Sequence, residues 1–205
     1  MSKEKEQNFK VMVLGDAAVG KTSIIRRYVH NFFSAHHKTT VGVDFHLKLL
    51  TVGEKTVRMQ LWDIAGQERY GQISRVYYKN SFGAMIVYDV TNPVTFETVA
   101  KWKEQIDQRV QLPNGSPLPV VLIGNKCDLE EADIDQTQLD KFCSEKGFIS
   151  WFDTSAKLNL NIDKACRTLV QAIMSHDDLF DHKDQKSKGF QPGMKENQKA
   201  ESGCC

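Results

Sequence analysis

Several marks of specialised proteins are missing from this sequence. No apolar run approaches the length of a membrane span, and the opening stretch MSKEKEQNFK lacks the apolar core of a signal peptide. The net charge of +1 gives no bulk attraction to nucleic acid or to acidic partners. We therefore expect a protein that is made and kept in the cytosol and that binds no nucleic acid.

Closely spaced cysteines are also scarce. Cys127, Cys143 and Cys166 stand singly, which favours small buried side chains in a reducing compartment over disulfide bonds. The other two, Cys204 and Cys205, are the last residues of the sequence. The segment before them offers no partner for a metal or redox role, so this pair needs a different explanation.

What is present is the composition of an ordinary soluble domain. Hydrophobic residues make up 40% of the chain and charged residues 26%. A chain of 205 residues can bury one sizeable α/β core and is too short for two comfortable ones.

Short apolar runs alternate with segments of helical spacing. Strands are predicted at residues 9–15, 43–52, 55–63, 83–90, 117–126 and 149–154, and helices at residues 21–32, 94–110, 136–146 and 162–174. The second and third strands form a hairpin. This order predicts an α/β fold of three layers, in which helices cover both faces of a six-stranded, mostly parallel sheet. The domain spans residues 1–175, and residues 176–205, polar and without an apolar period, are predicted to be a disordered tail.

The loop after the first strand carries a phosphate-binding pattern. GDAAVGKT, residues 15–22, matches G-x-x-x-x-G-K-[ST] between a predicted strand and a predicted helix. Its glycines let successive N–H groups face a polyphosphate, Lys21 reaches the outer phosphates, and the Thr22 hydroxyl can ligate Mg²⁺. These flanks favour a P-loop over a glycine turn with a solvated lysine. The residues expected around the phosphates are Asp16, Ala17, Ala18, Val19, Gly20, Lys21, Thr22 and Ser23.

Two further loops select the base. The segments NKCD and SAK follow strands and contribute Asn125, Lys126 and Asp128, and Ser155, Ala156 and Lys157. Asp128 can accept both donors on one edge of guanine, whereas adenine would leave its buried charge unpaired. Lys126 can lay its stem over the base, Asn125 can tie its loop to the P-loop, and the Ala156 N–H can donate to the guanine carbonyl.

The segment DIAGQERY, residues 63–70, has no histidine, serine or cysteine to act as a nucleophile. Phosphoryl transfer needs little covalent chemistry from the protein, so this is no objection. Asp63 would hold Mg²⁺ through a water, the Gly66 N–H would approach the γ-phosphate, and Gln67 would orient the attacking water. Thr40 would give a second Mg²⁺ ligand that exists only while the γ-phosphate is present.

Taken in order, these motifs resemble those of the Ras superfamily of small GTPases, and within it the Rab family, over about the first 175 residues. Rab character shows in VGVDF, WDIAGQERY and IVYDVTN. The resemblance implies that Phe45, Trp62 and Tyr77 form the aromatic triad that Rabs present to effectors, a role compatible with core packing, and that Phe33 packs on the guanine edge. The implied effector interface comprises Val41, Gly42, Val43, Asp44, Phe45, Trp62 and Tyr77.

The terminal cysteines fit this resemblance. A paired C-terminal cysteine is similar to the double geranylgeranylation signal of Rabs, and two lipid chains are what stable anchoring requires. The tail from His176 has five lysines against six acidic residues, so attraction to anionic lipid adds little. Cys204 and Cys205 are therefore expected to carry the anchor.

Other residues indicate a particular Rab subfamily or depart from the usual Rab pattern. Ile64 stands where most Rabs have threonine, and with RVYYK and LPNGSPLP it resembles the Rabs of lysosome-related organelles such as melanosomes. Ala17 and His37 depart from the common pattern near the γ-phosphate, which leaves open a GTP-binding scaffold that hydrolyses too slowly to cycle. A P-loop kinase acting on a small metabolite is a further alternative, and NKCD argues against it.

The resemblance also implies partners and a location. The partners are effectors, an exchange factor, a GTPase-activating protein, a prenylation escort and a dissociation inhibitor, bound by a monomeric G domain. The expected location is the cytoplasmic face of endosomal or lysosome-related membranes, with a cytosolic pool in the GDP form.

Overall fold

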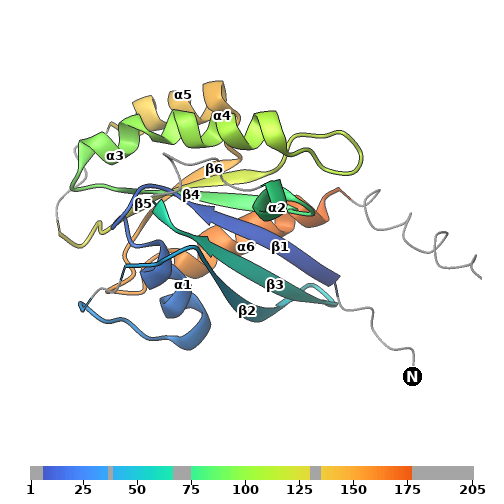
Figure 1. Ribbon diagram of the computed structural model, residues 1–205, viewed down its shortest axis with the longest axis horizontal. Helices are drawn as coiled ribbons and strands as arrows, with labels where there is room; N and C mark the ends of the chain where they lie inside the picture. Colours follow the sequence, from blue (N-terminus) through green and yellow to red (C-terminus); the bar gives the residue numbers. More distant parts are fainter. Residues whose placement is uncertain (1–6, 37–38, 67–74, 130–134, 177–205) are drawn as a thin grey trace, which may run out of the picture.

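The computed structural model describes residues 7–36, 39–66, 75–129 and 135–176 (Figure 1). One six-stranded sheet runs through them in the order β2-β3-β1-β4-β5-β6. Its strands are β1 (Gln7–Leu14), β2 (Val43–Val52), β3 (Lys55–Ile64), β4 (Gly83–Asp89), β5 (Val120–Asn125) and β6 (Ser150–Thr154). Only β2 is antiparallel to its neighbour; the other four pairs are parallel. The predicted α/β fold with a mostly parallel sheet is confirmed.

Helices cover both faces of this sheet. They are α1 (Lys21–His30), α2 (Arg75–Tyr78), α3 (Pro93–Glu97), α4 (Val99–Arg109), α5 (Gln136–Lys146) and α6 (Ile162–Met174). In Figure 1, α1 and α6 lie on one side of the sheet and α3, α4 and α5 on the other. The three layers therefore enclose two separate cores.

Strand alternation divides the apolar residues between the two cores. Val11 and Val13 of β1 face the core built with α1 and α6, whereas Met12 and Leu14 face the core built with α4 and α5. All four side chains are fully buried. Successive residues of a strand point to opposite faces, so a strand covered on both faces is apolar throughout. This is why β1, β4 and β5 are near-continuous apolar runs.

The β2–β3 hairpin is also confirmed, and its turn depends on a glycine. Gly53 and Glu54 form the two-residue connection, and Gly53 adopts φ +59°, a left-handed conformation. On β2 the odd-numbered Phe45, Leu47 and Leu49 are exposed, because none of the described helices covers that face at the edge of the sheet. The hairpin thus leaves an apolar row in contact with solvent.

The prediction of one helix over residues 94–110 is wrong, because the structure divides it at Thr98 into α3 and α4. Two threonine hydroxyls compete for backbone carbonyls here. Thr95 Oγ1 donates to the Asn92 carbonyl at 2.7 Å, and Thr98 Oγ1 donates to the Thr95 carbonyl at 2.9 Å. The break lets α4 begin with its own direction over the sheet.

The fifth predicted strand, at residues 117–126, begins three residues late in the structure, at Val120. Pro117 and Pro119 have no N–H to donate to a neighbouring strand. Their segment therefore approaches the sheet without joining it as a regular strand.

The three described cysteines form no disulfide, and Cys143 and Cys166 are buried while Cys127 is half-buried. Across the described ranges, none of the helices combines the length and the apolar character needed to cross a bilayer. The tail from residue 177 lies outside the described residues.

Candidate nucleotide-binding site

The P-loop connects the end of β1 to the start of α1 and needs glycine at two positions. Gly15 has φ +139°, and a Cβ there would lie 2.1 Å from the Val87 carbonyl oxygen. Gly20 has φ +97°, and a Cβ there would lie 2.2 Å from Asn125 Nδ2. A side chain at either position would drive the loop away from β4 or β5. The loop is thus held against these two strands.

Lys21, the first residue of α1, is buried and turns back into the loop. Its Nζ donates to the Gly15 carbonyl at 2.9 Å and to the Asp16 carbonyl at 2.7 Å. Burial lowers the pKa of Lys21 to about 8, and the negative charges of Asp63 and Asp16 oppose that shift. Carbonyls are weaker partners than a phosphate oxygen. The ammonium is therefore placed to gain from an anion in the loop.

Three oxygen-bearing side chains meet beside Lys21. The Thr22 hydroxyl donates to Asp63 Oδ2 and lies 2.8 Å from the Thr40 hydroxyl oxygen. Asp63 is fully buried, and its other oxygen, Oδ1, has no hydrogen-bond partner among the described residues. Burial raises the pKa of the Asp63 carboxyl, and the hydrogen bond from Thr22 opposes that shift. A buried carboxylate oxygen left without a partner, next to two hydroxyls, fits the oxygen ligands of a hard divalent cation.

The segment that follows β3 touches the P-loop at Gly66. A Cβ on Gly66 would lie 2.2 Å from the Ala17 nitrogen and 2.4 Å from the Asp16 carbonyl carbon. The contact is therefore backbone against backbone. A space of about 30 Å³ opens beside it, lined by Ala17, Ala18, Gly20, Lys21, Thr22, Thr39, Thr40 and Gly66. Gln67 and His37 lie outside the described residues.

A larger cavity of about 430 Å³ adjoins the P-loop and is lined by Ala18, Gly20, Ser23, Phe33, Ser34, Ala35, Asn125, Lys126, Asp128, Leu129, Ala156 and Lys157. The structure thus places Phe33, NKCD and SAK around one volume. Asp128 points its carboxylate toward Ser155, whose hydroxyl donates to Oδ1 at 2.6 Å, and toward Lys157, whose Nζ lies 3.7 Å from Oδ2. Both contacts hold the carboxylate in one orientation at the cavity.

Asn125 joins three loops at the floor of this cavity. Its Nδ2 donates to the Val19 carbonyl at 2.9 Å, and its Oδ1 accepts from the Ala156 N–H at 3.2 Å. The side chain is buried, with 1% of its surface exposed. The P-loop, NKCD and SAK are therefore positioned by one amide.

Comparison with known proteins decides what this arrangement is. The model of the Ras family matches residues 10–175. The chain belongs to the Ras family. It is 50% identical over 205 residues to the Ras-related protein Rab-32 of Sus scrofa, covering 98% of this chain and 90% of the relative. It is also 55% identical over 176 residues to Rab-32A of Dictyostelium discoideum, covering 84% and 80%, and 48% identical over 171 residues to human Rab-7L1, covering 83% and 84%.

The resemblance to Rabs is thereby confirmed. This Ras-family chain is a small GTPase that binds GTP and GDP, hydrolyses GTP and acts in membrane traffic. It works with regulators and effectors, as Rab GTPases do in general.

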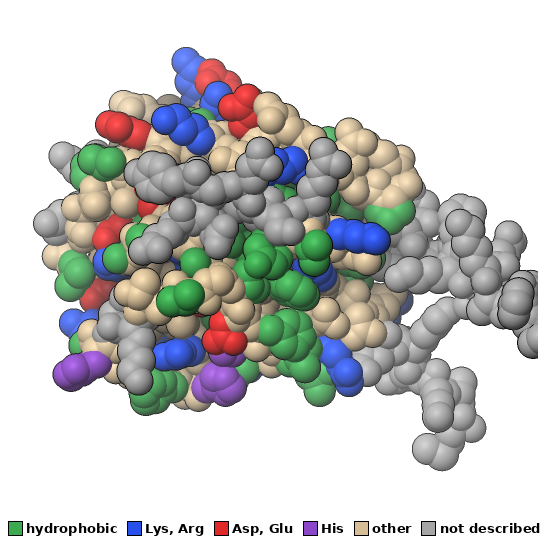
Figure 2. All heavy atoms as spheres, in the orientation of Figure 1, with side chains coloured by type: hydrophobic (Ala, Val, Ile, Leu, Met, Phe, Trp, Pro, Cys, Tyr) green, Lys and Arg blue, Asp and Glu red, His purple; other side chains and the backbone are tan. Residues whose placement is uncertain are grey.

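The three aromatic residues expected to face effectors in this Ras-family chain, Phe45, Trp62 and Tyr77, lie on one face of the molecule. Phe45 of β2 and Trp62 of β3 meet edge to face with ring centroids 5.9 Å apart. Lys10 of β1 holds its Nζ 4.0 Å from the Trp62 ring centroid. Tyr77 of α2 packs partly buried against the core under α4, and Val41 is 90% exposed. Hydrophobic side chains gather on this face, over β2, β3 and α2 (Figure 2).

Three residues that contact the loops of the Ras-family site were not predicted as site residues from the sequence. Arg27 of α1 donates to the carbonyls of Ala156, at 2.8 Å, and Lys157, at 3.0 Å. Asp89, at the end of β4, holds the Lys126 ammonium 2.6 Å from its Oδ2. Trp102 of α4 reaches the P-loop. Only Asp89 had a signal, because it is an acid directly after a buried strand.

Proposed function

We propose that this GTPase is a switch in which the segments around Thr40 and Gly66 are ordered by Mg²⁺-GTP and released after hydrolysis. The meeting of Thr22, Thr40 and Asp63, with an unpartnered buried oxygen on Asp63, is the observation that carries the proposal. Thr40 comes from the loop between α1 and β2, and its hydroxyl lies 2.8 Å from that of Thr22. Its position there is what a γ-phosphate-dependent state requires.

The residues that would hold Mg²⁺ are Thr22 and Thr40 directly and Asp63 through water. When bound, the ion neutralises charge on the outer phosphates. Lys21 and the loop N–H groups would bind the phosphates, and the Gly66 N–H would meet the γ-phosphate. Gln67, outside the described residues, would orient the attacking water. The catalytic work of the protein is positioning and charge stabilisation.

Guanine would occupy the larger cavity. Asp128, held by Ser155 and Lys157, supplies the acceptor pair for the two guanine donors. The Ala156 N–H, which donates to Asn125 Oδ1 at 3.2 Å, would be shared with the guanine carbonyl. Phe33 and the Lys126 stem would close over the base. A buried carboxylate is well matched to guanine and poorly matched to adenine.

We further propose that residues 1–175 form the G domain and that residues 176–205 connect it to a lipid anchor on Cys204 and Cys205. Effectors would bind Val41–Phe45, Trp62 and Tyr77, where apolar surface is exposed. The proposed location is the cytoplasmic face of an endosomal or lysosome-related membrane, and its support is that the relatives Rab-32 and Rab-7L1 are membrane-associated trafficking GTPases. The proposed GTPase cycle also involves an exchange factor, a GTPase-activating protein, a prenylation escort and a dissociation inhibitor.

Single-turnover hydrolysis of Mg²⁺-GTP tests the switch. Gln67→Leu should slow hydrolysis by about 10-fold or more while GTP affinity stays within about twofold, because water positioning acts only in the transition state. Gln138→Leu, on the exposed face of α5, is the matched control and should leave the rate unchanged. A negligible rate even with an activating protein, unchanged by Gln67→Leu, would favour the slow scaffold instead.

Nucleotide competition tests the base assignment. GTP should displace bound GDP at concentrations at which ATP does not. Equal affinity for ATP and GTP would contradict the role of Asp128 and favour a P-loop kinase.

A further inference from the structure

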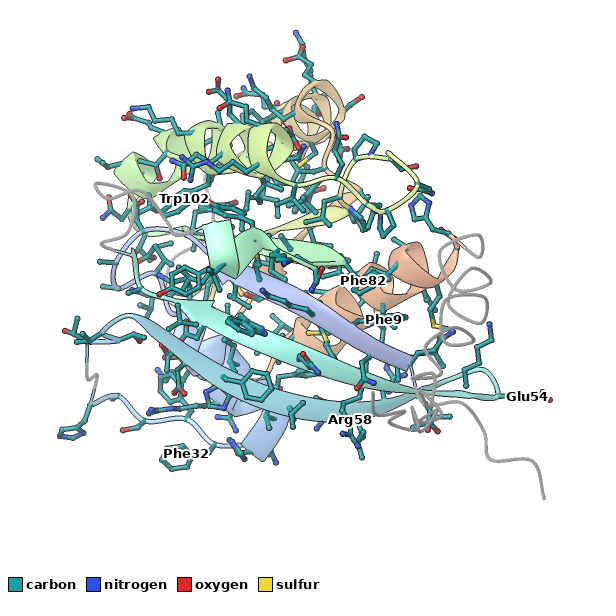
Figure 3. All side chains as sticks on the ribbon, turned by 45° about the vertical axis from the view of Figure 1, so that its right-hand side comes forward. Phe9, Phe32, Glu54, Arg58, Phe82 and Trp102 are labelled. Atoms are coloured by element: carbon teal, nitrogen blue, oxygen red, sulfur yellow. The ribbon has the colours of Figure 1, made fainter. Side chains whose placement is uncertain are left out.

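The Asp16 side chain of the P-loop points away from the loop interior, toward α4. Asp16 Oδ1 accepts a hydrogen bond from Trp102 Nε1 at 3.0 Å, across 86 residues of sequence. Both side chains are buried, with 8% of Asp16 and 2% of Trp102 exposed. Trp102 projects from α4 toward the sheet (Figure 3). A helix on one face is thus joined directly to the phosphate-binding loop.

The peptide that follows Asp16 is the one that Gly66 touches. The Asp16 carbonyl also accepts from Lys21 Nζ at 2.7 Å. A Cβ on Gly66 would lie 2.4 Å from the Asp16 carbonyl carbon and 2.2 Å from the Ala17 nitrogen. Gly66 can therefore take its position only if the Asp16–Ala17 peptide keeps its own.

The hydrogen bond ties that peptide to a rigid element. Val99 and Ile106 of α4 are fully buried in the core beneath the helix, so Trp102 is carried by a well-packed segment. A hydrogen bond to a carboxylate is stronger than one between neutral groups, and losing it would leave a buried indole N–H unsatisfied. Trp102 itself lines neither the 430 Å³ cavity nor the 30 Å³ space, so it does not touch the nucleotide site.

We propose that Trp102 is a positioning residue for GTP hydrolysis. It acts through Asp16, whose orientation fixes the Asp16–Ala17 peptide against which Gly66 rests in the GTP form. The inference depends on the proposed contact of Gly66 with the γ-phosphate. Nucleotide binding also uses Asn125 and Asp128, which Trp102 does not contact through any described hydrogen bond. Its loss should therefore slow hydrolysis more than it weakens binding.

Trp102→Phe removes the N–H and keeps an aromatic ring. Trp151→Phe is the matched control, because Trp151 Nε1 also donates to an aspartate, Asp140, at 2.7 Å, far from the P-loop. In single-turnover assays, we expect Trp102→Phe to hydrolyse GTP about 10-fold more slowly while its GDP dissociation rate changes by less than about twofold. Trp151→Phe should match the wild type in both rates.

A double-mutant cycle separates positioning from general loosening of the fold. If Trp102 acts through Asp16, Trp102→Phe should cause little further loss in an Asp16→Ala background. Asp16→Asn keeps an oxygen acceptor and should lose less activity than Asp16→Ala. These two comparisons hold even if Trp102→Phe lowers the melting temperature.

Two results would overturn the inference. One is a Trp102→Phe rate equal to that of Trp151→Phe. The other is a loss of equal size with and without the Asp16 carboxylate. Gln67→Leu, measured alongside, distinguishes the causes. If Gln67→Leu does not slow hydrolysis, the result counts against the proposed switch. If Gln67→Leu slows hydrolysis and Trp102→Phe does not, the result counts only against the positioning role.

Discussion

At the scale of single residues, the described site depends on side chains that bind other loops as well as facing the nucleotide cavity. Asn125 is the strongest case, since it bonds the Val19 carbonyl and the Ala156 N–H and is almost fully buried. Arg27 of α1 likewise holds the SAK loop, through hydrogen bonds to the carbonyls of Ala156 and Lys157. The nucleotide would therefore meet loops that are already held in place, which reduces the ordering cost of binding.

Asn125→Ala tests this directly. The change leaves the Val19 carbonyl and the Ala156 N–H without their partner, which costs about 2–3 kcal/mol of binding free energy and so raises the dissociation constant for GDP about 30- to 160-fold. Competition with a fluorescent nucleotide measures it.

Asn114→Ala is the control, because Asn114 also accepts a backbone N–H, that of Ser116, but in an exposed loop. It should leave the dissociation constant for GDP unchanged. Equal effects of the two substitutions would show that Asn125 does not position the loops.

Motif residues were predictable because their spacing is local and their chemistry is set by the ligand. Lys21 begins α1 directly after the P-loop, Asn125 is the last residue of β5, and Asp128 follows it closely. These residue types at these places fit few functions other than nucleotide binding. Arg27 and Trp102 were not predictable, because their partners lie 129 and 86 residues away in sequence. Only the packing of α1 and α4 on the sheet brings these pairs together.

At the scale of elements, buried strands were predicted well and helix breaks poorly. Strands β1, β4 and β5 are apolar on both faces, so composition alone marks them. The break at Thr98 does not disturb the apolar spacing of residues 94–110, so periodicity could not find it. Helix α2 has four residues, too few to show a period, and was not predicted.

The β2–β3 turn gives a prediction about an element. Gly53 has φ +59°, and no described atom beyond its chain neighbours lies within 4 Å of the position that a Cβ would take. A side chain there would therefore cost only the strain of the left-handed backbone. Gly53→Ala should destabilise the domain by about 1 kcal/mol and lower its melting temperature by about 2–4 °C. Gly53→Asn should lose less, because asparagine tolerates the left-handed region. Thermal unfolding of the GDP-loaded protein measures both variants, and equal losses would contradict the strain argument.

At the scale of the whole molecule, the parallel strands bring the catalytic and recognition loops to one edge of the sheet. Four segments lie at the carboxyl ends of strands, which is where ligands bind in such folds: the P-loop, the segment after β3, NKCD and SAK. Phe45 of β2, which is exposed and pairs with Trp62, lies near that edge, whereas Leu47 and Leu49 lie further from it along the strand. A change in the nucleotide can therefore alter the surface offered to a partner without unfolding the domain.

The separation of this domain from its proposed anchor gives the last prediction. The family match ends at residue 175, so removing Cys204 and Cys205 should leave the dissociation constant for GDP within about twofold of the wild-type value. The same deletion should move the protein from the membrane fraction to the cytosol, because two lipid chains carry the anchoring and the tail has no excess of positive charge. Fractionation of cells expressing each form measures the change, with Ser202→Ala as a control that keeps both cysteines. High salt should not release the intact protein, since its attachment is apolar. A truncated form that stayed on membranes would contradict the anchor and would place the attachment on the G domain itself.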